Sequence, residues 1–242
     1  MSIRVEDLVH IYQAGTPLAT EALKGVTLEI QEGEFFGLIG QTGSGKSTLI
    51  QHLNGLIKPS RGLVQVDGQN LWERGANLKE IRQKVGLVFQ YPEHQLFEET
   101  VFADVAFGPR NMGLAEAEVK ERVEEALAIV GLDGEIVDRS PFELSGGQKR
   151  RVAIAGVLAM RPKYLILDEP TAGLDPMGRQ EILGEISALQ RQGVTVVLVS
   201  HNMEEVARLV SRLAVMHDGR IIVQGRPEEV FSKGDLLEEV GL

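Results

Sequence analysis

One short segment constrains this chain more than any other. Residues 40–47 read Gly-Gln-Thr-Gly-Ser-Gly-Lys-Ser and match the pattern G-x-x-x-x-G-K-[ST]. Its glycines allow successive backbone N–H groups to curl around a chain of phosphates, the lysine places a cation beside them, and the last serine offers a hydroxyl to Mg²⁺. An apolar run at 35–39 precedes it and a helix-forming run at 47–56 follows it, as such a loop requires. The residues predicted to bind a nucleoside triphosphate here are Gly40, Gln41, Thr42, Gly43, Ser44, Gly45, Lys46, Ser47 and Thr48.

A second motif joins an apolar run to two acidic residues. Residues 165–167 are Leu-Ile-Leu, and Asp168 and Glu169 follow them directly. A carboxylate at the tip of a buried strand can hold a metal-bound water, and its neighbour can act as a general base toward an attacking water. A strand that runs into a charged turn would explain the motif taken alone. The phosphate-loop pattern upstream favours the functional interpretation, in which Ser47 and Asp168 are metal ligands and Glu169 is catalytic.

A third motif reads Leu-Ser-Gly-Gly-Gln at 144–148. Ser145 is a good N-cap for the apolar helix that follows, and Gly146 and Gly147 leave the amides of its first turn open to an anion. A plain capped helix is the alternative interpretation. The position of the motif, between Lys46 and Asp168, favours a second anion-binding site formed by Ser145, Gly146, Gly147 and Gln148.

Hydrophobic periodicity predicts an α/β fold. The runs at 164–167 and 194–199 are apolar on both faces, which is typical of parallel strands covered by helices. Further strands are predicted at 3–12, within 23–39, and at 62–66, 85–90, 213–216 and 220–224. Helices are predicted at 115–131, 147–160 and 177–192. The result is an α/β core with a β-rich N-terminal part and a mainly helical insertion near 92–160.

Composition excludes several classes of protein. The chain has no cysteine, so disulfides and thiolate zinc sites are excluded. Its formal net charge of −10 argues against a nucleic-acid partner. The longest stretch without Asp, Glu, Lys or Arg, 8–20, is too short to cross a bilayer, and the N-terminus lacks the apolar core of a signal peptide. We therefore expect a soluble chain whose membrane role, if any, comes through a partner.

The three motifs in this order resemble the ATP-binding subunits of ABC transporters, over essentially the whole chain. The resemblance implies ATP and Mg²⁺ as cofactors and adds four functional residues. It makes Gln90 a contact of Mg²⁺ and water, His201 a sensor of the γ-phosphate, and Tyr12 a platform for adenine. Asp175 lies in Ala-Gly-Leu-Asp, which resembles the family's D-loop.

The resemblance also implies an architecture and an assembly. The fold is that of a P-loop NTPase of ABC type, with a RecA-like core, an N-terminal antiparallel β subdomain and a helical subdomain. We expect one domain, 1–242, with the helical subdomain at about 92–160 and a short C-terminal tail at about 226–242, where relatives often carry further helices. Two such subunits pack head to tail, so the phosphate loop of one faces Ser145–Gln148 of the other with ATP between them. The second subunit is a paralogue or another copy of this chain.

Two segments resemble one particular group within this family. Residues 91–101 and 104–109 are similar to the ATPases of energy-coupling factor importers of vitamins and metal ions, and residues 12–17 resemble one of the two paralogous ATPases of that group. The resemblance implies a membrane coupling subunit bound at about 91–107, indirect contact with a substrate-binding membrane subunit, and a peripheral location on the cytoplasmic face of the membrane. We expect an apolar groove there, formed by Leu96, Phe97, Val101 and Val105.

Three other functions are alternatives. The ATPase of an ordinary binding-protein-dependent importer would share the motifs, but the segment at 92–100 argues against it. A chromosome or DNA-repair ATPase would carry a long heptad insertion between the motifs, and none is seen. A nucleotide-gated regulatory module would need no groove for a membrane subunit.

Overall fold

A mixed six-stranded sheet forms the centre of the molecule. The computed structural model describes residues 1–132 and 134–242. The strand order is β10-β9-β3-β8-β7-β6. The neighbours from β9 to β6 are parallel, and β10 alone runs antiparallel to β9. The strands are β3 (Phe35–Ile39), β6 (Val85–Val88), β7 (Tyr164–Asp168), β8 (Thr195–Val199), β9 (Arg212–His217) and β10 (Arg220–Gly225).

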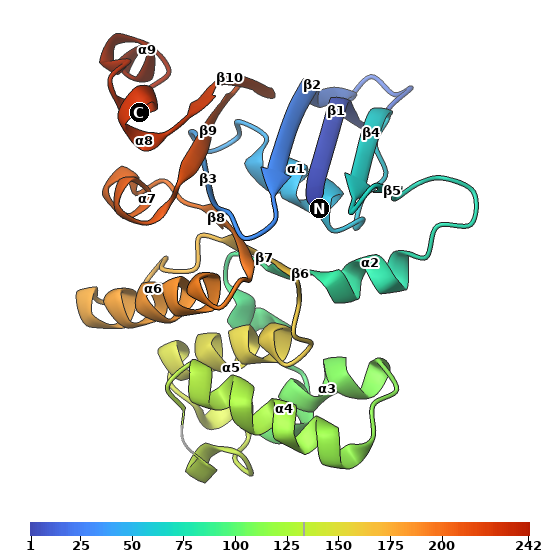
Figure 1. Ribbon diagram of the computed structural model, residues 1–242, viewed down its shortest axis with the longest axis vertical. Helices are drawn as coiled ribbons and strands as arrows, with labels where there is room; N and C mark the ends of the chain where they lie inside the picture. The colour runs from blue at the N-terminus through green and yellow to red at the C-terminus, as the bar shows by residue number, and fades with distance from the viewer. Residues whose placement is uncertain (133) are drawn as a thin grey trace.

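A second, antiparallel sheet packs against the first. Its order is β2-β1-β4-β5, and its strands are β1 (Ser2–Tyr12), β2 (Thr20–Gln31), β4 (Arg61–Val66) and β5 (Gln69–Asn70). Helix α1 (Lys46–Leu53) lies beside this sheet (Figure 1). Leu49 and Leu53 of α1, Ile3 and Val5 of β1, and Phe36 of β3 belong to one buried cluster. The two sheets and α1 therefore share an apolar core.

Most of the other helices pack around a second buried cluster on the opposite side of the six-stranded sheet, but Ile81 of α2 belongs to the cluster around α1. Figure 1 shows α3, α4 and α5 grouped at the end of the molecule away from β1 and β2. The helices are α2 (Leu78–Lys84), α3 (Val101–Asn111), α4 (Glu116–Ile129), α5 (Gly146–Leu158), α6 (Pro176–Arg191), α7 (Met203–Leu209), α8 (Pro227–Phe231) and α9 (Gly234–Glu239). Three 3₁₀ turns are η1 (Pro92–Gln95), η2 (Gly134–Ile136) and η3 (Pro141–Glu143). Among the residues described, no helix combines the length and the apolar character needed to cross a membrane.

The predicted fold class is confirmed, with corrections at the ends of elements. The strand predicted at 85–90 ends at Val88, because Tyr91 takes a left-handed conformation and η1 begins at the next residue. The run at 23–39 is divided into two strands by a turn in which Gly33 has φ 74°. The helix predicted to reach residue 56 ends at Leu53, and Gly55 takes φ 68° just beyond it. Sequence periodicity did not identify the short helices α2, α7, α8 and α9.

The groove prediction also needs a correction. Val101 and Val105 are fully buried in the core that α3 forms with α4 and α5, so neither can line a surface groove. Phe97 is 58% exposed, and the ring of Phe107, on α3, packs edge-on against it. The exposed side of this segment is therefore formed by Phe97 and Phe107.

A polar cluster joins the two sheets at one edge. Tyr164 begins β7 and is fully buried, and its hydroxyl donates to Asp67 Oδ1, in the turn after β4, at 2.6 Å. Lys163 Nζ donates to both carboxylate oxygens of Asp67 at 3.1 Å. Burial opposes ionisation of Asp67, but the hydrogen bonds from Tyr164 and Lys163 hold the pKa of its carboxyl below the ordinary value. The cluster therefore links the sheets through an ionised Asp67.

Replacing Tyr164 by phenylalanine tests this link. The ring and its packing are kept while the bond to a charged acceptor is lost, so Tyr164→Phe is expected to lower the free energy of unfolding by about 1.5–3 kcal/mol. Urea unfolding measures the change. The matched control is Tyr91→Phe, at an exposed tyrosine, which is expected to shift stability by less than about 0.5 kcal/mol. Equal effects of the two substitutions would contradict the role of the cluster.

Candidate functional site

The loop between β3 and α1 has a backbone that only glycine accommodates at two positions. Gly45 is the N-cap of α1 and has φ 103°, and a Cβ there would lie 2.8 Å from the carbonyl oxygen of Ala22. Gly40 has φ 152°, and a Cβ there would collide with the carbonyl of Met216. Within the described chain no side chain caps α1. The first amides of α1 and its positive dipole end are therefore free to bind an anion.

Lys46 is held over this loop. Its Nζ donates to the carbonyl oxygens of Gly40 at 2.6 Å and Gln41 at 2.8 Å. Burial lowers the pKa of the ammonium, while the nearby carboxylates of Glu169 and Asp168 act in the opposite direction. A phosphate bound in the loop would offer Lys46 a full negative charge in place of two carbonyl dipoles.

Ser47 and Asp168 lie side by side although they come from α1 and the end of β7. Ser47 Oγ donates to Asp168 Oδ2 at 3.0 Å. Asp168 is buried, and burial, together with the charge of Glu169, raises the pKa of its carboxyl. Two hard oxygen donors at this spacing fit Mg²⁺, which would neutralise the charge of bound phosphates. Gln90, also predicted to be a metal ligand, is exposed beyond β6, and among the residues described no hydrogen bond joins it to this pair.

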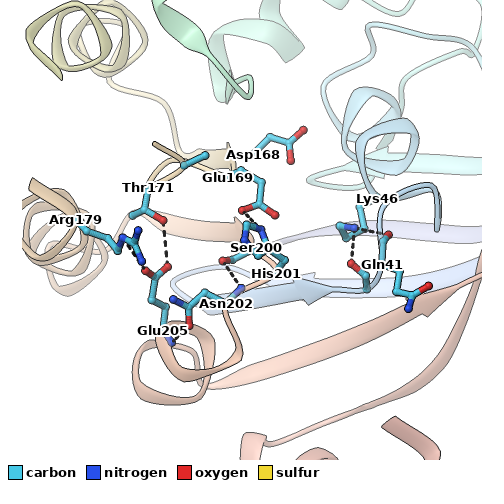
Figure 2. A network of polar contacts seen from close by, with 12 residues as sticks. Gln41, Lys46, Asp168, Glu169, Thr171, Arg179, Ser200, His201, Asn202 and Glu205 are labelled. Carbon is cyan, nitrogen blue, oxygen red and sulfur yellow. Dashed lines mark hydrogen bonds and ion pairs between the residues drawn. The ribbon is translucent and has the colours of Figure 1, made fainter. Parts of the chain in front are cut away.

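Glu169 and His201 form a second pair. His201 Nδ1 lies 2.8 Å from Glu169 Oε2, and the His201 side chain is 75% exposed. Glu169 has φ 49°, a conformation uncommon outside glycine, and its N–H donates to the carbonyl of Val199 at the end of β8. Figure 2 shows the Glu169 side chain directed toward His201. The arrangement can orient a water molecule and accept its proton at Glu169.

A network that sequence reasoning missed supports this pair. Glu205, on α7, is buried, and its Oε2 accepts a hydrogen bond from Thr171 Oγ1 at 3.2 Å (Figure 2). Arg179, on α6, lies 3.8 Å from Glu205 Oε1. Asn202 caps α7 by accepting from the amide of Glu205. The segment after Glu169 is thereby tied to the helix after His201. The Asn202 cap was recognisable from sequence, but a buried glutamate was not.

Tyr12 lies at the end of β1 and faces the start of α1. Its hydroxyl lies 3.1 Å from Thr48 Oγ1, and 41% of the residue is exposed. An aromatic ring with an exposed surface is thus held next to the helix that follows the phosphate-binding loop.

The remaining predicted residues lie elsewhere. Ser145 and Gln148 form a capping box at the start of α5, and a Cβ at Gly146 or Gly147 would meet nothing within 4 Å. Helix α5 packs on the opposite side of the six-stranded sheet from α1, toward α3 and α4 (Figure 1). Asp175 is exposed and caps α6 by accepting from the Gly178 amide at 2.8 Å. The structure therefore brings together the residues of the first two motifs but not those of the third.

A buried arginine missed from the sequence links these regions. Arg150, on α5, donates to both carboxylate oxygens of Glu93, in η1, at 3.1 and 3.2 Å. It also donates to the carbonyl of Ala172, three residues before Asp175. The segment after Gln90, helix α5 and the segment before Asp175 are thus joined by one side chain.

A family model described as "ABC transporter" matches residues 23–172. The energy-coupling factor transporter ATP-binding protein EcfA2 of Caldanaerobacter subterraneus subsp. tengcongensis is 60% identical over 100% of this chain and 85% of its own length. The EcfA2 protein of Symbiobacterium thermophilum is 61% identical over 100% of this chain and 84% of its own length.

Solved structures that resemble this chain are also ABC transporter subunits. CbiO1 from Clostridium perfringens, described as part of the ABC transporter complex cbiONQ, has a TM-score of 0.84 and 43% identity, and the match covers 98% of this chain and 93% of that one. The ATP-binding cassette MJ0796, a dimer in a post-hydrolysis state bound to ADP and Pi, has a TM-score of 0.84 and 31% identity, covering 93% and 98%.

The chain belongs to the ABC transporter family. Within that family its full-length matches at about 60% identity are energy-coupling factor transporter ATP-binding proteins, and it is a member of their group. The resemblance identified from the sequence motifs is confirmed at both levels.

Removing the carboxylate of Glu169 tests the catalytic assignment. Glu169→Gln keeps the size of the side chain but cannot accept a proton, so steady-state ATP hydrolysis is expected to fall by about 10²–10⁴-fold. ATP affinity measured by calorimetry is expected to stay at the wild-type value. The matched control, Glu204→Gln, changes an exposed residue of α7 and is expected to keep the wild-type rate. Normal turnover of Glu169→Gln would disprove the assignment.

Proposed function

We propose that this chain is the ATP-hydrolysing subunit of an energy-coupling factor transporter and powers the import of a vitamin or a metal ion. The observation that carries the proposal is the convergence of three features at the carboxyl ends of the neighbouring parallel strands β3, β8 and β7. These are the phosphate-binding loop, the Ser47–Asp168 pair and the Glu169–His201 pair. In open parallel sheets this edge is where ligands bind. We treat 1–242 as one such domain, with its helical part at about 92–160.

Most of the predicted residues then have a role. The loop from Gly40 to Gly45 and Lys46 hold the phosphates of ATP, and Tyr12 stacks on the adenine. Ser47, Asp168 and Gln90 hold Mg²⁺. Glu169 takes the proton of the attacking water, and His201, which contacts Glu169 at 2.8 Å, responds to the γ-phosphate.

We further infer that a complete site needs two subunits. Ser145 and the open amides of Gly146 and Gly147 form an anion-binding helix start on α5, which packs on the opposite side of the six-stranded sheet from α1, the helix that begins at Lys46. The related cassette MJ0796 is a dimer. In a head-to-tail pair, the α5 terminus of one subunit would close the phosphate-binding loop of the other. The second subunit is a paralogue in the cell, and a second copy of this chain can take its place at high concentration.

Mixing two inactive variants tests the shared site. Lys46→Ala loses the phosphate contact and Gly147→Asp places a negative charge at the start of α5, so each is expected to be inactive alone. In a mixed dimer, one site receives an intact Lys46 and an intact Gly147 from different chains, and part of the ATPase rate is expected to return. The control is the double variant in one chain, which cannot complement either single variant. A mixture that dimerises yet stays inactive would contradict head-to-tail sharing.

A groove next to the segment that follows Gln90 suits the membrane partner. It has a volume of about 600 Å³, and its apolar lining includes Leu56, Leu87, Phe89, Leu96, Phe97 and Phe107. The backbone that carries Phe97 is fixed by Asp104, which is buried and accepts from the amides of Phe97 and Glu98, both at 3.2 Å. A preformed apolar groove of this kind accepts the apolar face of a helix.

The position of the groove supports coupling between ATP hydrolysis and the membrane subunit. Gln90 and the turn η1 lead from the end of β6 to Phe97, and Glu93 within η1 is held by Arg150. A helix of the membrane coupling subunit that binds at about 91–107 would therefore contact the segment that directly follows Gln90. In this proposal the chain lies at the cytoplasmic face of the membrane, attached through that subunit, and has only indirect contact with a substrate-binding membrane subunit.

Placing a charge in the groove is expected to separate transport from hydrolysis. Phe97→Asp changes an exposed side chain away from the phosphate-binding loop, so the ATPase rate of the isolated protein is expected to remain normal. Loss of a central aromatic contact is expected to weaken binding of the membrane subunit by about tenfold or more. Co-purification of membrane proteins and vitamin uptake by cells measure this, with Phe97→Tyr as the control that keeps the ring. Normal uptake by Phe97→Asp would exclude the groove, and loss of both activities would make Phe97 part of the core.

A further inference from the structure

Two histidines and a threonine form a closed ring of contacts with Tyr12. Tyr12 OH lies 3.1 Å from Thr48 Oγ1, and the carbonyl oxygen of Thr48 lies 2.8 Å from His52 Nδ1. His52 Nε2 lies 3.2 Å from His10 Nδ1. The ring of His10 returns to Tyr12 in an edge-on contact, with 4.5 Å between centroids and 76° between planes. The ring of contacts joins β1 to α1, directly after the phosphate-binding loop.

The nitrogen atoms that carry a hydrogen in these contacts can be deduced from the atoms that can only accept one. A carbonyl oxygen only accepts, so His52 Nδ1 must carry a hydrogen. His52 is fully buried, and its burial lowers the pKa to about 4, so it is neutral at pH 7 and its Nε2 has a free lone pair. His10 Nδ1 must then be the donor in the bond between the two histidines. The His10 ring is therefore oriented by a partner that is itself fixed on α1.

Tyr12 is held from two directions as a result. His10 and Tyr12 are two residues apart on β1, so their side chains point to the same face of the strand. Thr48 holds the hydroxyl end of Tyr12, and His10 packs against its ring. The ring nevertheless remains 41% exposed, which leaves surface for a ligand to stack on. A ring that is already held loses less side-chain freedom when a ligand binds.

We propose that His10 and His52 are positioning residues that hold the Tyr12 ring ready for the base of the nucleotide. The inference rests on the proposed function, in which Tyr12 stacks on adenine and the Gly40–Ser47 loop holds the phosphates. The pair contributes to affinity for the base and does not act on the phosphates or on the attacking water.

An ordinary structural role makes a different prediction. If the two histidines only stabilise the packing of β1 on α1, their loss loosens the helix that starts at Lys46. The affinity for every ligand of the loop then falls by the same factor. If they position Tyr12, only ligands with a base are affected. Inorganic tripolyphosphate, which has the phosphates but no base, separates the two cases.

The experiment is a double-mutant cycle on His10 and Tyr12. His10→Ala is expected to raise the Kd and KM for ATP by about three- to tenfold, a fraction of the affinity that an aromatic platform gives a base. Its kcat at saturating ATP and its Kd for tripolyphosphate are expected to equal those of the wild type. Tyr12→Ala is expected to weaken ATP binding at least as much, and the double variant is expected to be no weaker than Tyr12→Ala alone, because His10 acts through Tyr12.

Several results would overturn the inference. They are an additive double variant, an equal loss of tripolyphosphate affinity, or a Tyr12→Ala protein that binds ATP normally. In each of these cases the proposed ATPase function stands, because the wild-type protein still binds and hydrolyses ATP, whereas a wild-type protein that binds no ATP would remove both proposals. If His10→Ala does not fold, His10→Asn, which keeps an amide donor near the position of Nδ1, carries the same comparison.

Discussion

The close approach of backbone around the loop between β3 and α1 is the constraint on which the rest of this structure depends. Gly45 leaves no room for a Cβ beside Ala22 of the antiparallel sheet, and Gly40 leaves none beside Met216 of the six-stranded sheet. The loop is thus enclosed by both sheets at once. Its amides are presented to a ligand only as long as the two sheets keep their packing, which the shared core around α1 and the Tyr164–Asp67 contact maintain.

Charged side chains lie close together at the site. Lys46, Asp168 and Glu169 meet in a partly dehydrated region where burial lowers the pKa of the lysine and raises that of Asp168. Desolvated groups gain more from a bound counter-charge than groups in water do. Among the residues described, the Lys46 ammonium donates hydrogen bonds only to backbone carbonyls of the loop, so a bound phosphate group would improve its electrostatic environment. These features suit the site to an anionic ligand.

Buried charged side chains also link the segments that lie between the groove and the Glu169–His201 pair. Arg150 joins η1, next to the groove, to the carbonyl of Ala172, and Glu205 joins Thr171 to the helix after His201. Both links involve side chains with little exposure, so a movement of one segment without the other would leave a charge buried and unpaired. The groove, the Glu169–His201 pair and the segment before Asp175 are therefore expected to move together.

Local signals in the sequence determined the phosphate-binding loop, the parallel strands and the Ser145 cap, because glycine conformation, two-sided apolar runs and capping depend on near neighbours in the chain. They did not determine which face of α3 is covered: Val101 and Val105 were assigned to a groove, but α4 and α5 bury them and leave Phe97 and Phe107 outside. Nor could they pair His10 with His52 or Thr171 with Glu205. Those contacts join residues far apart in sequence, and only the packing of strands and helices brings the partners together.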